Sequence, residues 1–302
     1  MIGISVRQIE VFVSIAATGT VRGAAERLSV TQPAVSMALA ELERHLGSPL
    51  FDRERGRLYL SPRGKELLPM AQEVLERLQE MLRQSHGAPL TLTGNLRIGA
   101  SNTIGNYLVG DLLRAFIQAH PQVALHVDVA NTHAIAAGLL NHTLDVGAIE
   151  GPMNHPQLEI MPWRDDTLVV CAAPGHRLAS TPNLRASHFA GAHWILREPG
   201  SAMRTQAEQA LGALPPGRIV LELGQVEAIK QAVIAGLGLA CLPESAVIDP
   251  VANGRLVILP TPFLNLQRRL SLVLHKSRYR GALLEAFLQS LANHVIKESH
   301  AD

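Results

Sequence analysis

Three short stretches near the start of the chain place apolar residues at helical spacing. The first stripe steps by three or four residues through Ile9, Phe12, Val13 and Ala16. It ends at Gly19, a second helix is predicted over residues 20–28, and a third begins after Thr31, a favourable N-cap, with Pro33 in its first turn. Two helices joined by so short a link are typical of a helix-turn-helix.

The third helix has an apolar face and, opposite it, a face of small, polar or basic residues. A helix that enters a DNA major groove needs close approach, hydroxyl or amide groups for base edges, and a cation near phosphate. The outer face supplies all three, although the solvated side of a purely structural helix would look similar. The candidate DNA contacts on this helix are Thr31, Gln32, Pro33, Ser36, Met37 and Arg44.

Residues 50–60 predict a β-hairpin, because apolar positions flank a charged tip. The tip carries Arg53, Arg55 and Arg57, which would lie along the phosphate backbone as the wing of a winged helix-turn-helix. Arginines in a solvated loop are the alternative, but their position directly after the third helix favours the wing.

A long helix is predicted over residues 63–84, with apolar residues at alternating steps of four and three, the spacing of a coiled-coil seam. The seam consists of Leu67, Ala71, Val74, Leu78 and Met81. The three short helices already bury their own stripes, so we expect a second copy of the chain to cover this seam. Packing of the helix against its own chain is the alternative.

A break at residues 86–89 separates this helix from a long segment in which strands and helices alternate, an α/β pattern. We therefore predict a DNA-binding head over 1–62, a linker helix over 63–88 and a further domain over 93–302. The predicted elements of that domain include strands at 95–100, 123–130 and 144–149 and helices at 107–119, 133–140 and 281–294.

Composition and charge agree with this division. The chain has 302 residues, of which 47% are hydrophobic, and carries a net charge of +1, which is ordinary for a globular protein of about two domains. Residues 1–65 hold nine Lys or Arg against six Asp or Glu, whereas residues 93–302 hold sixteen of each sign. We find neither a signal peptide nor a membrane-spanning run, so we expect a cytoplasmic protein with no membrane partner.

Enzyme motifs are not apparent in the sequence. We find no zinc-protease, nucleophile-elbow, P-loop or dinucleotide pattern, and the 13 histidines are scattered, so we expect no catalytic residue, cofactor or metal. Cys171 and Cys241 lie in apolar runs and are expected to be buried rather than redox-active. A cytoplasmic enzyme or a small-molecule binding protein on the same scaffold is the alternative function.

The head resembles the winged helix-turn-helix of LysR-type transcriptional regulators. The resemblance rests on residues 7–12, 24–28, 31–36, 42–43, 46–47 and 50–51, with Arg53 and Gly64. It implies promoter DNA as a partner, with RNA polymerase as a further candidate. It also implies an effector domain similar to type II periplasmic binding proteins, in which two α/β subdomains enclose a cleft, and homodimers through the linker helix that assemble into homotetramers.

Within that family, the second domain is most similar to YeiE-like regulators, some of which respond to sulfite or related sulphur metabolites. This similarity is carried by residues 100–107, 149–152, 194–201, 227–230 and 236–238. The chain departs from that branch at Ala202 and Met203, where Gly-Thr is usual, and at Gln225, where asparagine is more usual.

Hydroxyl, amide and arginine side chains gather at the ends of predicted strands, next to helix starts, and backbone N–H groups at such starts favour anions. We therefore expect a small anionic effector, first a sulphur oxyanion such as sulfite and then a small carboxylate. It would act by shifting the hinge equilibrium and so the bending of DNA. Simple helix caps are the alternative. The candidate effector residues are Ser101, Asn102, Thr103, Asn131, Thr132, Glu150, Arg197 and Ser201.

Overall fold

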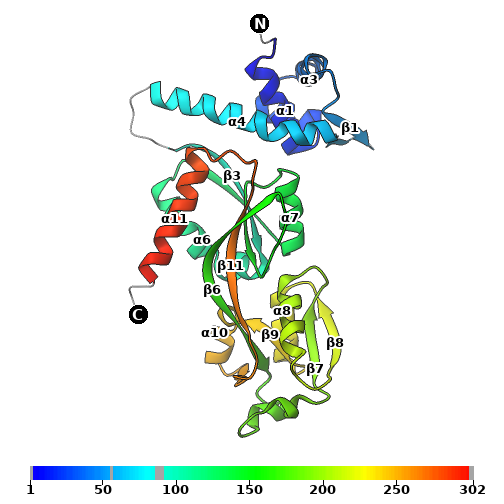
Figure 1. The fold of residues 1–302 in the computed structure, drawn as a ribbon, viewed down its shortest axis with the longest axis vertical. Coiled ribbons are helices and arrows are strands. Elements are labelled where there is room, and N and C mark those ends of the chain that lie inside the picture. Colours follow the sequence, from blue (N-terminus) through cyan, green and yellow to red (C-terminus); the bar gives the residue numbers. More distant parts are fainter. Residues whose placement is uncertain (1–2, 55–56, 86–91, 299–302) are drawn as a thin grey trace.

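The computed structural model describes residues 3–54, 57–85 and 92–298, which form a helical head, a long helix and an elongated α/β domain (Figure 1). The head begins with a capping box: the Ser5 hydroxyl accepts a hydrogen bond from the backbone N–H of Gln8, and the Gln8 side chain accepts one from the backbone N–H of Ser5. The first helix ends at Gly19, which has φ +68°. Its elements are α1 (Val6–Thr18), α2 (Val21–Leu28), α3 (Gln32–Leu46), β1 (Phe51–Glu54) and β2 (Arg57–Leu60).

The hairpin β1–β2 is fixed to the helices of the head by one aromatic pair and one backbone bond. Phe51 packs edge-on against Phe12 of α1, with ring centroids 5.6 Å apart, and the Leu58 amide donates to the Gly19 carbonyl at 2.9 Å. Both rings are buried in the core of the head, so the predicted hairpin has a defined orientation relative to α1.

The long helix α4 (Pro62–Ser85) corrects one expectation. Leu67 and Ala71 pack against the core of the head, so the inference that nothing in the head could cover the seam is wrong for these two positions. Val74 and Met81, by contrast, are 41% and 59% exposed. Leu67 and Ala71 are covered because the first turns of α4 cross α1. Helical periodicity by itself does not reveal such a crossing.

The first half of the effector domain has a sheet in which β3 (Gly94–Ser101) lies between β4 (Val123–Ala130) and β5 (Val146–Glu150), parallel to both. The helix predicted over 107–119 is α6 (Val109–Ala119), and an additional short helix, α5 (Asn102–Tyr107), precedes it and meets it at Leu108. A further helix, α7 (Thr132–Leu140), follows β4. The parallel strands bring the carboxyl ends of β3 and β5 to the same edge of the sheet.

Two long antiparallel strands, β6 (Leu158–Ala172) and β11 (Gln267–His275), run from the first subdomain into the second (Figure 1). After β11, α11 (Ala282–Glu298) packs on α6. The second subdomain comprises η1 (Arg177–Ser180), η2 (Ala186–Phe189), β7 (His193–Arg197), α8 (Ala202–Leu211), β8 (Arg218–Leu223), α9 (Val226–Ile234), β9 (Ala240–Pro243), α10 (Glu244–Ala252) and β10 (Val257–Leu259).

Each subdomain has a hydrophobic core of its own, so the two are joined mainly by β6 and β11. Cys171 and Cys241 are both buried on the paired strands β6 and β9, and burial raises the pKa of each thiol to about 12. Across the described parts of the chain, we find no helix long and apolar enough to cross a membrane.

Candidate DNA-binding surface and effector site

The six candidate residues on α3 are all exposed, and Met37 is the most prominent apolar one, at 72% exposure. The apolar stripe on the other side of α3, at Val35, Leu39 and Leu42, is buried in the core of the head. Thr31 has a structural task as well, because its Oγ1 accepts a hydrogen bond from the Ala34 amide at 3.4 Å. The helix therefore presents the predicted face to solvent.

The basic residues near this face are not tightly held. Arg44 is 3.7 Å from Glu41 in an exposed ion pair, an interaction that contributes little to stability and leaves the guanidinium available. Arg53 and Arg57 on the hairpin are exposed, while Arg55 lies outside the described residues. The head thus carries exposed arginines on both α3 and the hairpin.

At the carboxyl end of β3, three consecutive polar residues are almost fully buried. Ser101 stands at the N-cap position of α5, yet its hydroxyl makes no hydrogen bond to any described residue. Thr103 Oγ1, in the first turn of α5, donates to Glu150 Oε2 at the end of β5, at 2.5 Å. Asn102 Oδ1 is likewise buried without a partner among the described residues. Helix capping therefore does not account for Ser101.

Arg268 on β11 completes this cluster, although it was not among the residues predicted from the sequence. Its guanidinium lies 2.6 Å from Glu150 and 2.6 Å from Asp166, and it also donates to Thr103 Oγ1 at 3.1 Å. On β11, the buried residues Arg268 and Leu270 alternate with the exposed residues Gln267 and Arg269. An arginine at an inward position of a strand is the signal that could have identified it.

The second subdomain contributes Arg197 at the end of β7, with a side chain only 1% exposed. Its Nε and Nη2 donate to the Glu198 carboxylate at 2.7 and 2.8 Å, whereas Nη1 reaches no acceptor in the described chain. Burial alone would raise the pKa of Glu198, but the hydrogen bonds and charge of Arg197 outweigh it and lower that pKa. Ser201, at the N-cap position of α8, is also buried.

Asn131 connects the two subdomains. Its Nδ2 donates to Glu198 Oε1 at 3.3 Å, while its Oδ1 caps α7 by accepting from the Ala134 amide at 2.9 Å. Beside it, Thr132 Oγ1 lies 3.5 Å from the Glu150 carbonyl oxygen, to which it donates. The predicted positions on α5, β5, α7 and β7 are therefore linked through Glu150, Asn131 and Glu198.

A second bridge between the subdomains was not predicted. Tyr107 of α5 donates its hydroxyl to Glu227 of α9 at 3.1 Å, and Lys230 pairs with the same carboxylate at 2.6 Å. Burial, and then the charge of Glu227, raises the pKa of Tyr107, so the phenol stays protonated and can donate. The described His, Cys, Asp and Glu side chains form no group that could hold a metal ion.

Comparison with known proteins identifies two family models along the chain. Residues 6–65 match the bacterial regulatory helix-turn-helix protein, lysR family, and residues 91–295 match the LysR substrate binding domain. The uncharacterized HTH-type transcriptional regulator YeiE of Escherichia coli is 36% identical over 94% of this chain and 96% of its own length.

Solved structures agree with these matches. A full-length OxyR variant from Pseudomonas aeruginosa is similar with a TM-score of 0.77 and 27% identity, covering 95% of this chain and 94% of that one. The CcmR regulatory domain of Synechocystis, solved in complex with 2-PG, has a TM-score of 0.61 and 29% identity, covering 67% of this chain and 97% of that one.

Proposed function

This chain belongs to the LysR family of DNA-binding transcriptional regulators, and on that premise we propose which of its surfaces bind DNA and which bind the effector. Its relatives are regulators, in agreement with the expectation that it is not an enzyme. The exposed face of α3 enters the major groove, where Gln32 and Ser36 reach base edges. The hairpin arginines Arg53, Arg55 and Arg57 follow the phosphate backbone. The protein acts on promoter DNA in the cytoplasm, with RNA polymerase as a further partner.

Anisotropy titrations on an operator selected from genomic DNA test this assignment. Gln32→Ala should weaken specific binding by about 1–3 kcal/mol and relax discrimination at one base pair, because it removes an amide that reads a base edge. Arg53→Ala should weaken binding to all sequences. It should also reduce the slope of the logarithm of the binding constant against the logarithm of the salt concentration by about one, because one phosphate contact is lost. Arg269→Ala, which changes an exposed arginine of the effector domain, is the matched control and should leave DNA binding unchanged.

The effector is a small anion, with a sulphur oxyanion such as sulfite favoured and a small carboxylate next. The observation that carries this is the set of buried polar atoms without a partner in the described chain: Ser101 Oγ, Asn102 Oδ1 and Arg197 Nη1. Such atoms cost about 1–3 kcal/mol each unless a ligand or water satisfies them. The hydroxyl and the guanidinium can both donate to an anion, as can the amide of Asn102 after a flip.

An anion shared by the two subdomains would act through their relative position. Asn131 and Glu198 already join the subdomains by one hydrogen bond, so a ligand that adds bonds to Ser101 and Arg197 favours the arrangement in which they meet. Since α4 contacts the first subdomain, this shift reaches the head and changes DNA bending.

Calorimetry with sulfite, sulfate, phosphate, small carboxylates and 2-PG tests the effector assignment. Ser101→Ala should weaken binding of the recognised anion about tenfold, the effect of losing one hydrogen bond to a charged group. Ser14→Ala is the control, because Ser14 in α1 is also a buried serine whose hydroxyl meets no described partner. Equal affinities for the two variants, or no binding of any anion, would contradict the proposal.

A further inference from the structure

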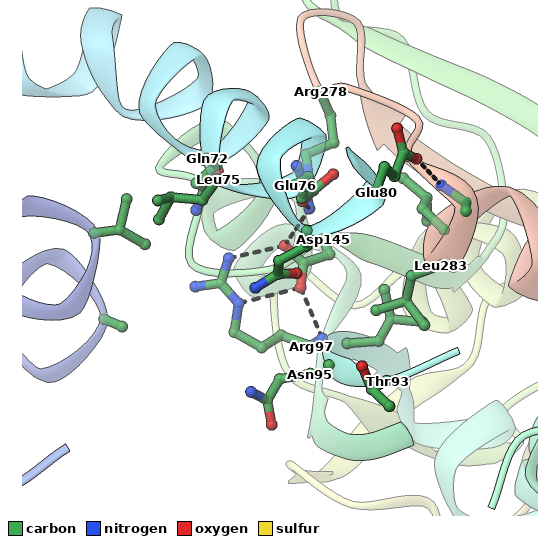
Figure 2. Close-up of a pocket in the computed structure, with 18 of the residues that line it drawn as sticks. Gln72, Leu75, Glu76, Glu80, Thr93, Asn95, Arg97, Asp145, Arg278 and Leu283 are labelled. Atoms are coloured by element: carbon green, nitrogen blue, oxygen red, sulfur yellow. Dashed lines mark hydrogen bonds and ion pairs between the residues drawn. The ribbon is translucent and has the colours of Figure 1, made fainter. Parts of the chain in front are cut away.

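A cavity of about 200 Å³ lies where the head, the linker helix and the effector domain meet (Figure 2). Its walls come from the inner side of α4, the start of β3 and the turn between β11 and α11. Asn95 and Arg97 line it near the amino end of β3, whereas Ser101 of the candidate effector site stands at the carboxyl end of that strand. The cavity is therefore separate from the candidate effector site.

Charges of both signs line the cavity and balance one another. Glu76 of α4 is ion-paired with Arg278, which also lies 3.5 Å from Asp145. Asp145 in turn accepts from the guanidinium of Arg97 at 2.8 and 3.2 Å. The ionisable residues of the lining are Arg27, Arg97 and Arg278 on the positive side and Glu76, Glu80 and Asp145 on the negative side. Such a wall suits neither a bare cation nor a bare anion.

Two buried side chains in this wall have unused hydrogen-bonding groups. The side chain of Arg278 is 9% exposed, and its Nε and Nη1 meet no acceptor among the described residues. Gln72 of α4 is 8% exposed, and its Oε1 meets no donor in the same part of the chain. The wall thus offers two donors and one acceptor, and buried groups of this kind are normally satisfied by a ligand or by ordered water.

We propose that this cavity is a second small-molecule site, for a zwitterion of amino-acid type, whose carboxylate accepts from Arg278 and whose ammonium group donates to Gln72 and the nearby carboxylates. An engineered cavity of about 150 Å³ binds benzene, so a cavity of about 200 Å³ has room for a molecule of about six non-hydrogen atoms, the size of alanine. Burial raises the pKa of Glu76, and the charge of Arg278 only partly offsets this, so a neighbouring ammonium group would favour the ionised carboxylate.

The residues of this site also clamp the linker helix to the effector domain. Glu80 accepts from the Ala282 amide at 2.9 Å and from the Tyr279 hydroxyl at 3.2 Å. The Arg77 guanidinium lies 4.6 Å from the centre of the Tyr279 ring. A ligand that binds between Gln72 and Arg278 therefore changes how firmly α4 is held, and this input to the head is independent of the candidate effector site.

Thermal unfolding of the full chain with L-alanine or L-serine, compared with acetate and methylamine, tests the proposal. A saturable rise in Tm of a few degrees that Gln72→Leu removes is expected with the amino acids, because only they carry both charges. Methylamine should give no rise, and any rise that acetate produces at the anion site should survive Gln72→Leu. Gln72→Leu should abolish the rise while the protein stays folded, since it removes an unpaired buried acceptor. Ser101→Ala should leave the rise intact, which separates this site from the anion site.

Hydrogen exchange measured with and without alanine shows where the amino acid binds. Slower exchange with alanine in residues 72–80 and 278–284 is the expected result. Protection confined to residues 101–103 and 197–201 would place the amino acid between the subdomains and overturn the proposal. So would a rise in Tm that survives Gln72→Leu, or amino acids that leave Tm unchanged, since the cavity then holds only water.

Discussion

His142 shows how one residue is fixed by its surroundings. It has φ +56°, a left-handed conformation, and its ring packs edge-on against His275 with centroids 4.5 Å apart. Burial, and then the charges of His275, Arg278 and Arg97, lower the pKa of His142 to about 4. The ring is therefore neutral in the folded protein at neutral pH, even though histidine in an unfolded chain titrates near 6.5.

This difference makes stability depend on pH. Between about pH 6.5 and pH 4 the unfolded chain takes up a proton at His142 that the folded chain does not, so stability is lost as the pH falls through this range. Thermal unfolding should show a smaller drop in Tm from pH 7 to pH 5 in His142→Asn, since asparagine tolerates the left-handed conformation without titrating. Parallel pH profiles for the two proteins would contradict this account.

At the scale of elements, the junction of the hairpin with α4 depends on close backbone approach. The hydroxyl of Ser61 donates to the Pro49 carbonyl at 2.8 Å and accepts from the Gly64 amide at 3.0 Å. A Cβ added at Gly64 would lie 2.1 Å from the Leu50 carbonyl oxygen, which is far inside contact distance. Glycine is needed here because the first turn of α4 touches the chain entering β1.

Gly64→Ala should therefore destabilise the head by about 1–3 kcal/mol, the usual cost of forcing extra volume into a packed site. Hydrogen exchange in residues 6–54 should become faster. Gly110→Ala is the control, because no described atom lies within 4 Å of an added Cβ in α6, and it should be neutral or stabilise by up to about 1 kcal/mol. If the hydrogen-exchange rates of the head were the same in Gly64→Ala as in the parent chain, α4 would be able to shift without loss of stability.

At the scale of the whole molecule, α4 divides its surface among different neighbours. Its first turns pack on the head, Glu76 and Glu80 hold the effector domain, and Met70, Val74 and Met81 remain exposed. Exposed apolar residues along one helix are typical of an interface. We therefore propose a dimer through the linker helix, with a contact surface that runs from Met70 to Met81.

Sedimentation measurements test this surface. Met81→Glu should weaken the dimer at least tenfold, because each of two copies loses a buried methionine worth about 1.5–3 kcal/mol. Met37→Glu is the matched control: it places the same charge on another exposed methionine, on α3, and should leave the dimer intact while weakening DNA binding. If both variants dimerise as tightly as the parent chain, α4 is not the dimer interface.

The sequence by itself determined the local elements and the family, because helical periodicity, caps such as Ser5 and Thr31, and the turn at Gly19 act within a few residues of the chain. It also indicated the polar positions at strand ends. Tertiary structure decided which atoms meet: Arg268 reaches Thr103 across 165 residues, and Glu76 reaches Arg278 across 202. The covered side of α4 was decided in the same way, since packing between distant segments follows from the whole fold and not from local pattern.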